Sequence, residues 1–111
     1  MTDVKITEKE FNTGLTNARI AISNMTGYRP VGGCGRVYVE IISPKVRANS
    51  KIAKLIESFG YRMTSRPYST GKNRIYVGYD NATGKEYMMG ELIAKELKAV
   101  GVSCYVDGDG D

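Results

Sequence analysis

Histidine is absent from this 111-residue sequence, and cysteine occurs only twice, at Cys34 and Cys104. Zinc is usually held by thiolate and imidazole groups, and the two cysteines lie far apart in the sequence, so we expect no metal site and no cofactor. Histidine is also the commonest general base, and no serine or cysteine lies in a recognisable nucleophile motif. The sequence therefore predicts a protein that is not an enzyme.

Long apolar runs are absent as well. No run approaches the ~20 residues that a membrane-spanning helix needs, and residues 1–5 are not followed by the apolar core of a signal peptide. We therefore expect a cytoplasmic protein without membrane contacts, in which both cysteines stay reduced. A chain of 111 residues, of which 41% are hydrophobic and 25% charged, predicts one domain over residues 1–111 with a core of its own.

Acidic residues are scarce in the middle of the chain. From Arg29 to Arg74, ten lysines and arginines stand against two acids, Glu40 and Glu57, which gives a net charge of +8 in a chain whose total is +4. Residues 107–111 are acidic instead. Concentrated positive charge favours a polyanion as the partner, either nucleic acid or an acidic protein surface. The alternative is a solvated basic face that only keeps the domain soluble.

Apolar periodicity predicts a first helix over about residues 8–25. Thr7 and Glu10 have the spacing of a capping box, in which the glutamate side chain reaches back to the threonine backbone. Apolar residues then recur at the spacing of one helical face: Phe11, Leu15, Ala18, Ile22 and Met25. Each large apolar side chain left in water would forfeit ~1.5–3 kcal/mol. This face must therefore cover the sheet, pack beside the other helices or contact a second copy of the chain.

Two further helices are expected. The second begins at the capping residue Asn49 or Ser50 and ends before Gly60, a glycine where a left-handed residue commonly stops a helix. The third follows a second capping-box pattern, from Thr83 to Glu86, and ends before residue 101.

Alternating β-branched and aromatic residues predict strands over about residues 36–42, 61–66, 72–80 and 102–106. In the clearest of them, two faces are expected, with Ile75, Val77 and Tyr79 on the apolar side and Lys72, Arg74 and Tyr76 on the basic side.

After the first helix, the predicted order of elements is β-α-β-β-α-β, which is that of ferredoxin-like α+β domains. Right-handed crossovers then place the second and third helices on one face of a four-stranded antiparallel sheet. The strands over residues 61–66 and 102–106 lie at its two edges. This core spans about residues 36–106 and is followed by an acidic tail, residues 107–111.

The sheet face opposite the helices is the candidate site. Cations on this face suit phosphates, and tyrosine rings suit stacked bases. The candidate residues are Arg36, Tyr38, Arg62, Arg66, Lys72, Arg74, Tyr76 and Tyr105. Arginine and lysine would contact phosphates, whereas Tyr38, Tyr76 and Tyr105 would stack on bases.

The chain resembles RNA-recognition-motif domains over about residues 36–106. The longer signature of that family is met by Lys72, Tyr76, Val77 and Tyr79, with tyrosine in place of phenylalanine, and it is not met at residues 73–75. The shorter signature is similar to residues 37–39, with Tyr38 as the stacking ring. The resemblance implies single-stranded RNA bound on the two central strands.

We therefore expect a small non-enzymatic domain that holds single-stranded nucleic acid on its sheet. The alternative is a protein-interaction module, such as a small phage- or mobile-element-type inhibitor that docks on an acidic or nucleic-acid-binding partner. A third hypothesis assigns a free nucleotide to the glycine-rich residues 32–36. A homodimer is compatible with the first two, and the position of the first helix separates them, because a covered sheet cannot stack bases.

Overall fold

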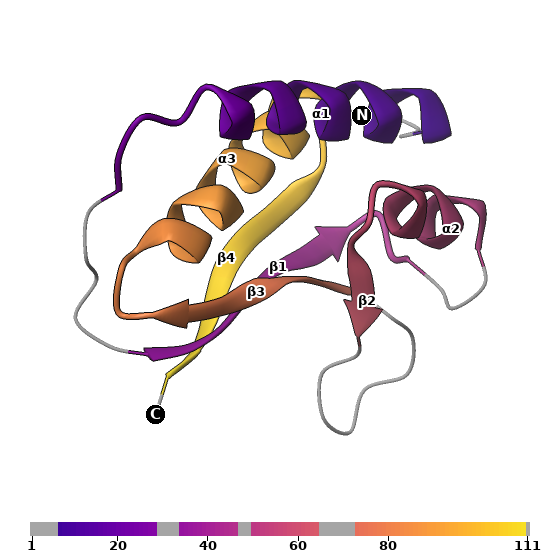
Figure 1. The fold of residues 1–111 in the computed structure, drawn as a ribbon. Coiled ribbons are helices and arrows are strands. Elements are labelled where there is room, and N and C mark those ends of the chain that lie inside the picture. The colour runs from indigo at the N-terminus through magenta and orange to yellow at the C-terminus, as the bar shows by residue number, and fades with distance from the viewer. Residues whose placement is uncertain (1–6, 29–33, 47–49, 65–72, 111) are drawn as a thin grey trace.

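The computed structural model describes residues 7–28, 34–46, 50–64 and 73–110. Its elements are α1 (Glu8–Ser23), β1 (Cys34–Ser43), α2 (Lys51–Ser58), β2 (Arg62–Thr64), β3 (Arg74–Asn81), α3 (Lys85–Ala99) and β4 (Ser103–Gly110). Within these residues the domain is α+β, with a four-stranded sheet in the order β2-β3-β1-β4. All pairings are antiparallel, and β2 and β4 form the edges, as predicted (Figure 1).

Local signals at three helix ends agree with the predictions. The backbone N–H of Thr7 donates to Glu10 Oε2 at 2.9 Å, which is the expected capping-box contact at the start of α1. Ser50 Oγ accepts from the backbone N–H of Ala53 at 3.1 Å and caps α2. Gly60 follows α2 with a φ of +94°, a conformation that costs glycine little. Helix α1 ends at Ser23, two residues earlier than predicted.

Helix α1 packs beside the other helices. Figure 1 shows all three helices on one side of the sheet, and Phe11, Leu15 and Ala18 are completely buried in the core that these helices share with it. Gly14 allows α1 to approach α3 closely, since a Cβ atom at this position would lie 3.0 Å from Leu97 Cδ2. The apolar stripe of α1 is thereby buried inside the helical layer. The described helices leave the opposite face of the sheet uncovered.

A β-bulge in β3 changes the face of one tyrosine. Val37 pairs with Gly78, but Tyr38 pairs with Tyr76, so Val77 is the extra residue of β3. Beyond the bulge the alternation is inverted, and Tyr79 pairs with Arg36 on the open face. Its side chain is 49% exposed. The predicted core-facing position of Tyr79 is therefore wrong.

A second bulge adjusts the pairing of β1 with β4. The register shifts between Ile41 and Ser43, which leaves Ile42 as the extra, exposed residue. Strand β4 then continues to residue 110, so that Asp107 pairs with Tyr38 inside the sheet. The residues expected to form an acidic tail thus belong largely to an edge strand.

Asp80, and not the predicted capping box, starts α3. Its Oδ1 accepts from the backbone N–H groups of Thr83 and Gly84, both at 2.9 Å, and its Oδ2 from that of Tyr87 at 3.1 Å. Burial by itself raises the pKa of Asp80, but the N–H groups of Gly84, Tyr87, Thr83 and Glu86 together outweigh burial and hold the pKa below its usual value. The bulge makes this arrangement available, because it turns Asp80 toward the helical layer.

Candidate nucleic-acid interface

The open face of the sheet consists of rows of side chains that run across all four strands. The register gives one row as Arg62, Tyr76, Tyr38 and Asp107, and the next as Thr64, Arg74, Glu40 and Tyr105. Alternation correctly placed Arg36, Tyr38, Arg62, Arg74, Tyr76 and Tyr105 on this face. Arg66, Lys72 and most of the glycine-rich segment lie outside the described residues.

Backbone pairing brings two of these cross-strand pairs close together. The N–H of Ile41 donates to the carbonyl oxygen of Asn73 at 2.8 Å, so the Ile41–Asn73 pair is hydrogen-bonded. The following pair, Glu40 with Arg74, is then of the non-hydrogen-bonded type, in which side chains approach most closely. Two residues further along each strand, Tyr38 and Tyr76 also form a non-hydrogen-bonded pair, and their ring centroids lie 5.6 Å apart.

Arg74 occupies the centre of the face and is held from several sides. Its guanidinium carbon lies 4.0 Å from the centroid of the Tyr38 ring. Its Nη2 lies 2.8 Å from Asp107 Oδ2, and its Nε lies 3.4 Å from Glu40 Oε1. Tyr105 donates its hydroxyl to Glu40 Oε2 at 3.0 Å. We call these five residues the Arg74 cluster.

The Arg74 cluster alters the predicted role of three residues. The two carboxylates of Glu40 and Asp107 outnumber the single positive charge of Arg74, whose side chain is only 11% exposed. The guanidinium covers Tyr38, which is 8% exposed and presents no open ring for a base. The hydroxyl of Tyr105 is engaged with Glu40. The centre of the face is consequently an ion-paired cluster with a formal net charge of −1, in contrast to the bare basic platform predicted from the sequence.

Two arginine–tyrosine pairs lie beside the cluster and are open to solvent. Arg36 on β1 is directly opposite Tyr79 on β3, and Arg62 on β2 is directly opposite Tyr76 on β3. Both arginines are exposed, Tyr79 is 49% exposed and Tyr76 is partly exposed. Side chains directly opposite across an antiparallel pair lie within contact reach of each other. We call these four residues the rim pairs.

Sequence reasoning missed two residues of this face. Tyr79 was assigned to the core, although Gly78 beside it was a signal for a bulge. Asp107 was assigned to the tail, although it continues the alternation of Ser103 and Tyr105 along β4.

Outside this face, the described residues contain no group of three or more histidine, cysteine, aspartate or glutamate side chains that could hold a metal ion. Burial raises the pKa of the Cys104 thiol to about 11, against a smaller opposing effect of Lys98. Among the same residues, no helix is long and apolar enough to cross a bilayer. Comparisons with family models, with curated proteins and with solved structures find no match.

Proposed function

We propose that this chain is a ferredoxin-like, non-enzymatic domain that binds single-stranded nucleic acid on the open face of its sheet. The observation that carries the proposal is the presence of the two rim pairs on that face, each of which combines an exposed arginine with a tyrosine ring. In this arrangement the arginines bind phosphates, and Tyr76 and Tyr79 stack on bases. Three supporting features are the β-α-β-β-α-β order after α1, the uncovered face and the resemblance of residues 36–106 to RNA-recognition-motif domains.

The Arg74 cluster has a supporting role in this proposal. Its contacts fix the rings and guanidinium at the middle of the face, so that the rim pairs stand on a rigid support. Tyr76 and Tyr79 are three residues apart on β3, or ~10 Å at a rise of ~3.3 Å per residue, which separates two stacking sites along one strand. Arg66 and Lys72 remain in the proposal from the sequence alone, as further phosphate contacts.

The test is a titration of labelled single-stranded RNA and DNA at two salt concentrations. Each phosphate contact contributes a slope of about −0.7 to the dependence of log affinity on log salt, so we expect steep weakening by salt. The double variant Arg36→Gln with Arg62→Gln should make this slope shallower, by the amount expected for the loss of about one to two phosphate contacts. Tyr79→Ala should cost roughly 1–3 kcal/mol, the value for loss of a stacked base.

Matched controls come from exposed residues outside the open face. Tyr28→Ala removes a tyrosine that is 48% exposed, and Lys9→Gln removes a cation of α1. Both variants should bind like the unmodified protein. Salt-independent binding, or no binding, would refute the proposal and leave the protein-interaction module as the better hypothesis. An equal effect of Tyr28→Ala and Tyr79→Ala would remove the rim pairs from it.

A further inference from the structure

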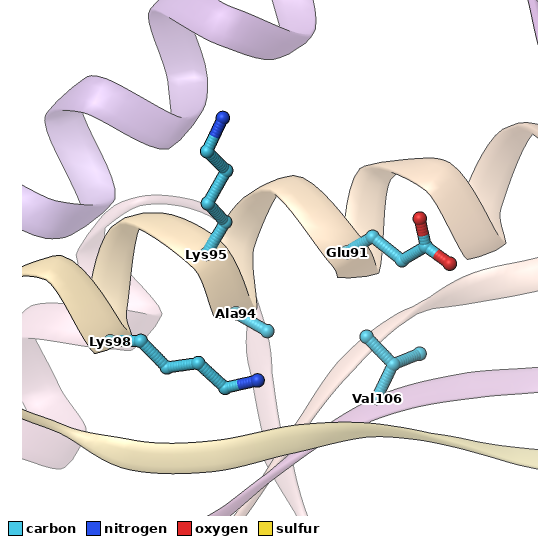
Figure 2. A pocket seen from close by; sticks show the side chains of 5 residues that line it. All are labelled: Glu91, Ala94, Lys95, Lys98 and Val106. Carbon is cyan, nitrogen blue, oxygen red and sulfur yellow. The ribbon is translucent and has the colours of Figure 1, made fainter.

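A cleft of about 320 Å³ lies along the contact between α3 and the edge strand β4. It is lined by Glu91, Ala94, Lys95 and Lys98 of α3 and by Val106 of β4. These four positions of α3 fall on one side of the helix. Figure 2 shows Ala94 and Val106 pointing toward each other from the helix and the strand, and Lys98 extending between them. The floor of the cleft is thus apolar, and the Lys98 ammonium lies beside it, whereas the Lys95 side chain extends away from Val106 in this view.

The backbone of β4 is available for pairing along this cleft. Because the N–H of Ile41 points to β3, the alternation of β1 turns Glu40 and Tyr38 toward β4. Their partners on β4, Tyr105 and Asp107, direct their backbone groups back toward β1. The intervening Val106, and likewise Cys104 and Gly108, must therefore direct their N–H and C=O groups outward from the sheet. Among the described residues, no strand pairs with this outer edge.

The cleft has an excess of positive charge. Lys95 and Lys98 are exposed, and within the described part of the chain no ion pair joins either of them to an acid. Among the residues that the structure describes, Glu91 is the only acidic side chain that lines the cleft. The positive charge of Lys98 acts on the strand, because it lowers the pKa of the Cys104 thiol and so opposes the larger upward effect of burial. An incoming strand with acidic side chains on the helical side would meet the Lys98 ammonium directly, and Lys95, which also lines the cleft, adds positive charge beside it.

A second copy of this chain fits the edge poorly. If two β4 strands paired, the side chains offered to each cleft would be those of Cys104, Val106 and Gly108, none of which is acidic. On the other face, the two Asp107 carboxylates would be brought onto the same small paired surface, where like charges are destabilising. Charge complementarity therefore selects a different occupant.

We propose that an extended acidic peptide segment of a partner protein adds to β4 as a fifth strand, beneath α3. Main-chain hydrogen bonds to Val106 and Gly108 supply affinity, as in other cases of strand addition. A residue opposite Val106 projects to the same side as Val106, so aspartate or glutamate at every second position lies on the side of the strand that faces the cleft lined by Lys98 and Lys95. This site is separate from the rim pairs, which lie on the other face of the sheet.

The experiment uses the full chain and a synthetic nonapeptide that alternates glutamate and threonine. Binding is measured by fluorescence anisotropy, and the site is located by protection of the Val106 amide from hydrogen exchange. Lys95→Glu with Lys98→Glu should weaken binding at least tenfold. Lys9→Glu with Lys85→Glu, which makes the same change of net charge outside the cleft, should leave binding within twofold.

Peptide variants keep the test independent of protein folding. In two further peptides, proline replaces every threonine or every glutamate. Each replacement removes the backbone N–H donors from one edge of the added strand, so one of the two peptides should fail to bind. An alternating lysine–threonine peptide should not bind. Equal affinity for both proline peptides and the parent peptide, equal loss in the two protein variants, or dimerisation through β4 in sedimentation would overturn the proposal. Arg36→Gln with Arg62→Gln should have no effect, which separates this result from nucleic-acid binding.

Discussion

Arg74 shows how a single side chain decides the character of a surface. Alternation places it on the open face beside tyrosines, where an arginine is expected to contact a phosphate. Its surroundings make it a structural residue instead, because its guanidinium lies on the Tyr38 ring and between Glu40 and Asp107. A cation–aromatic contact of this kind contributes ~1–2 kcal/mol when it is shielded from water. In the proposed function, the phosphate contacts are therefore assigned to exposed neighbours of Arg74.

We expect Arg74→Met to destabilise the fold by about 3 kcal/mol, since removal of one partner leaves the buried Glu40 carboxylate uncompensated. Arg74→Met combined with Glu40→Met should recover most of that loss, because an apolar pair of similar size avoids the buried charge. Equilibrium unfolding in urea measures both. The control Arg62→Met changes an exposed arginine of the same face and should stay within about 0.5 kcal/mol. Equal losses at Arg74 and Arg62 would contradict the assigned role.

At the scale of elements, the start of α3 depends on a carboxylate that belongs to β3. Asp80 satisfies the N–H groups of Thr83, Gly84 and Tyr87, which have no partners within the helix. Asp80→Asn removes the charge and one acceptor atom, and it should cost about 1–3 kcal/mol near neutral pH. Gly84 remains as the N-cap residue in both proteins.

The pH dependence of this cost follows from the lowered pKa of Asp80. The unfolded chain has a value near 3.8, and the folded chain has a lower one. The ionised carboxylate therefore contributes its full stability above the unfolded value, and this contribution is lost as pH falls from about 3.8 through the folded pKa. Urea unfolding between pH 2 and pH 7 should show the difference between Asp80→Asn and the unmodified protein shrinking only in acid. A constant difference would show that the charge plays no part.

The elements themselves follow from local sequence signals, whereas the face of each residue beyond a bulge does not. Capping residues Thr7 and Ser50 and the apolar stripe of α1 were sufficient to place two helices. Counting by twos fails after Val77, because an extra residue in one strand has no signature except the neighbouring glycine. The Arg74 cluster could not be predicted from the sequence for a related reason. Its members come from β1, β3 and β4, and their contacts depend on registers that alternation alone does not set.

At the scale of the whole molecule, α1 sets which surfaces remain for partners. The sequence required a place for its apolar stripe but left three choices, and packing against α3 and α2 decides among them. The helical layer is thereby completed on one side of the sheet. The open face, with its rim pairs, and the outer edge of β4 are two of the surfaces that stay uncovered on the described part of the chain.

Cys104 is buried in the shared core, and its Sγ donates to the Ala94 carbonyl oxygen at 3.6 Å, so its reactivity reports opening of the molecule. In a Cys34→Ser background, iodoacetamide at pH 8 should react with Cys104 at least a hundredfold more slowly than with a short peptide of residues 102–106. Burial raises the pKa from 9.0 in the reference state to about 11, so the folded thiol is almost entirely protonated at pH 8. Below pH 9 the thiol is protonated in both the folded and the unfolded state, so the raised pKa leaves stability unchanged there, and the fold loses stability as pH rises from 9.0 to about 11. Urea should accelerate labelling with the slope of global unfolding, because β4 and α3 must separate to admit the reagent. Fast labelling without urea would mean that the α3–β4 contact opens locally.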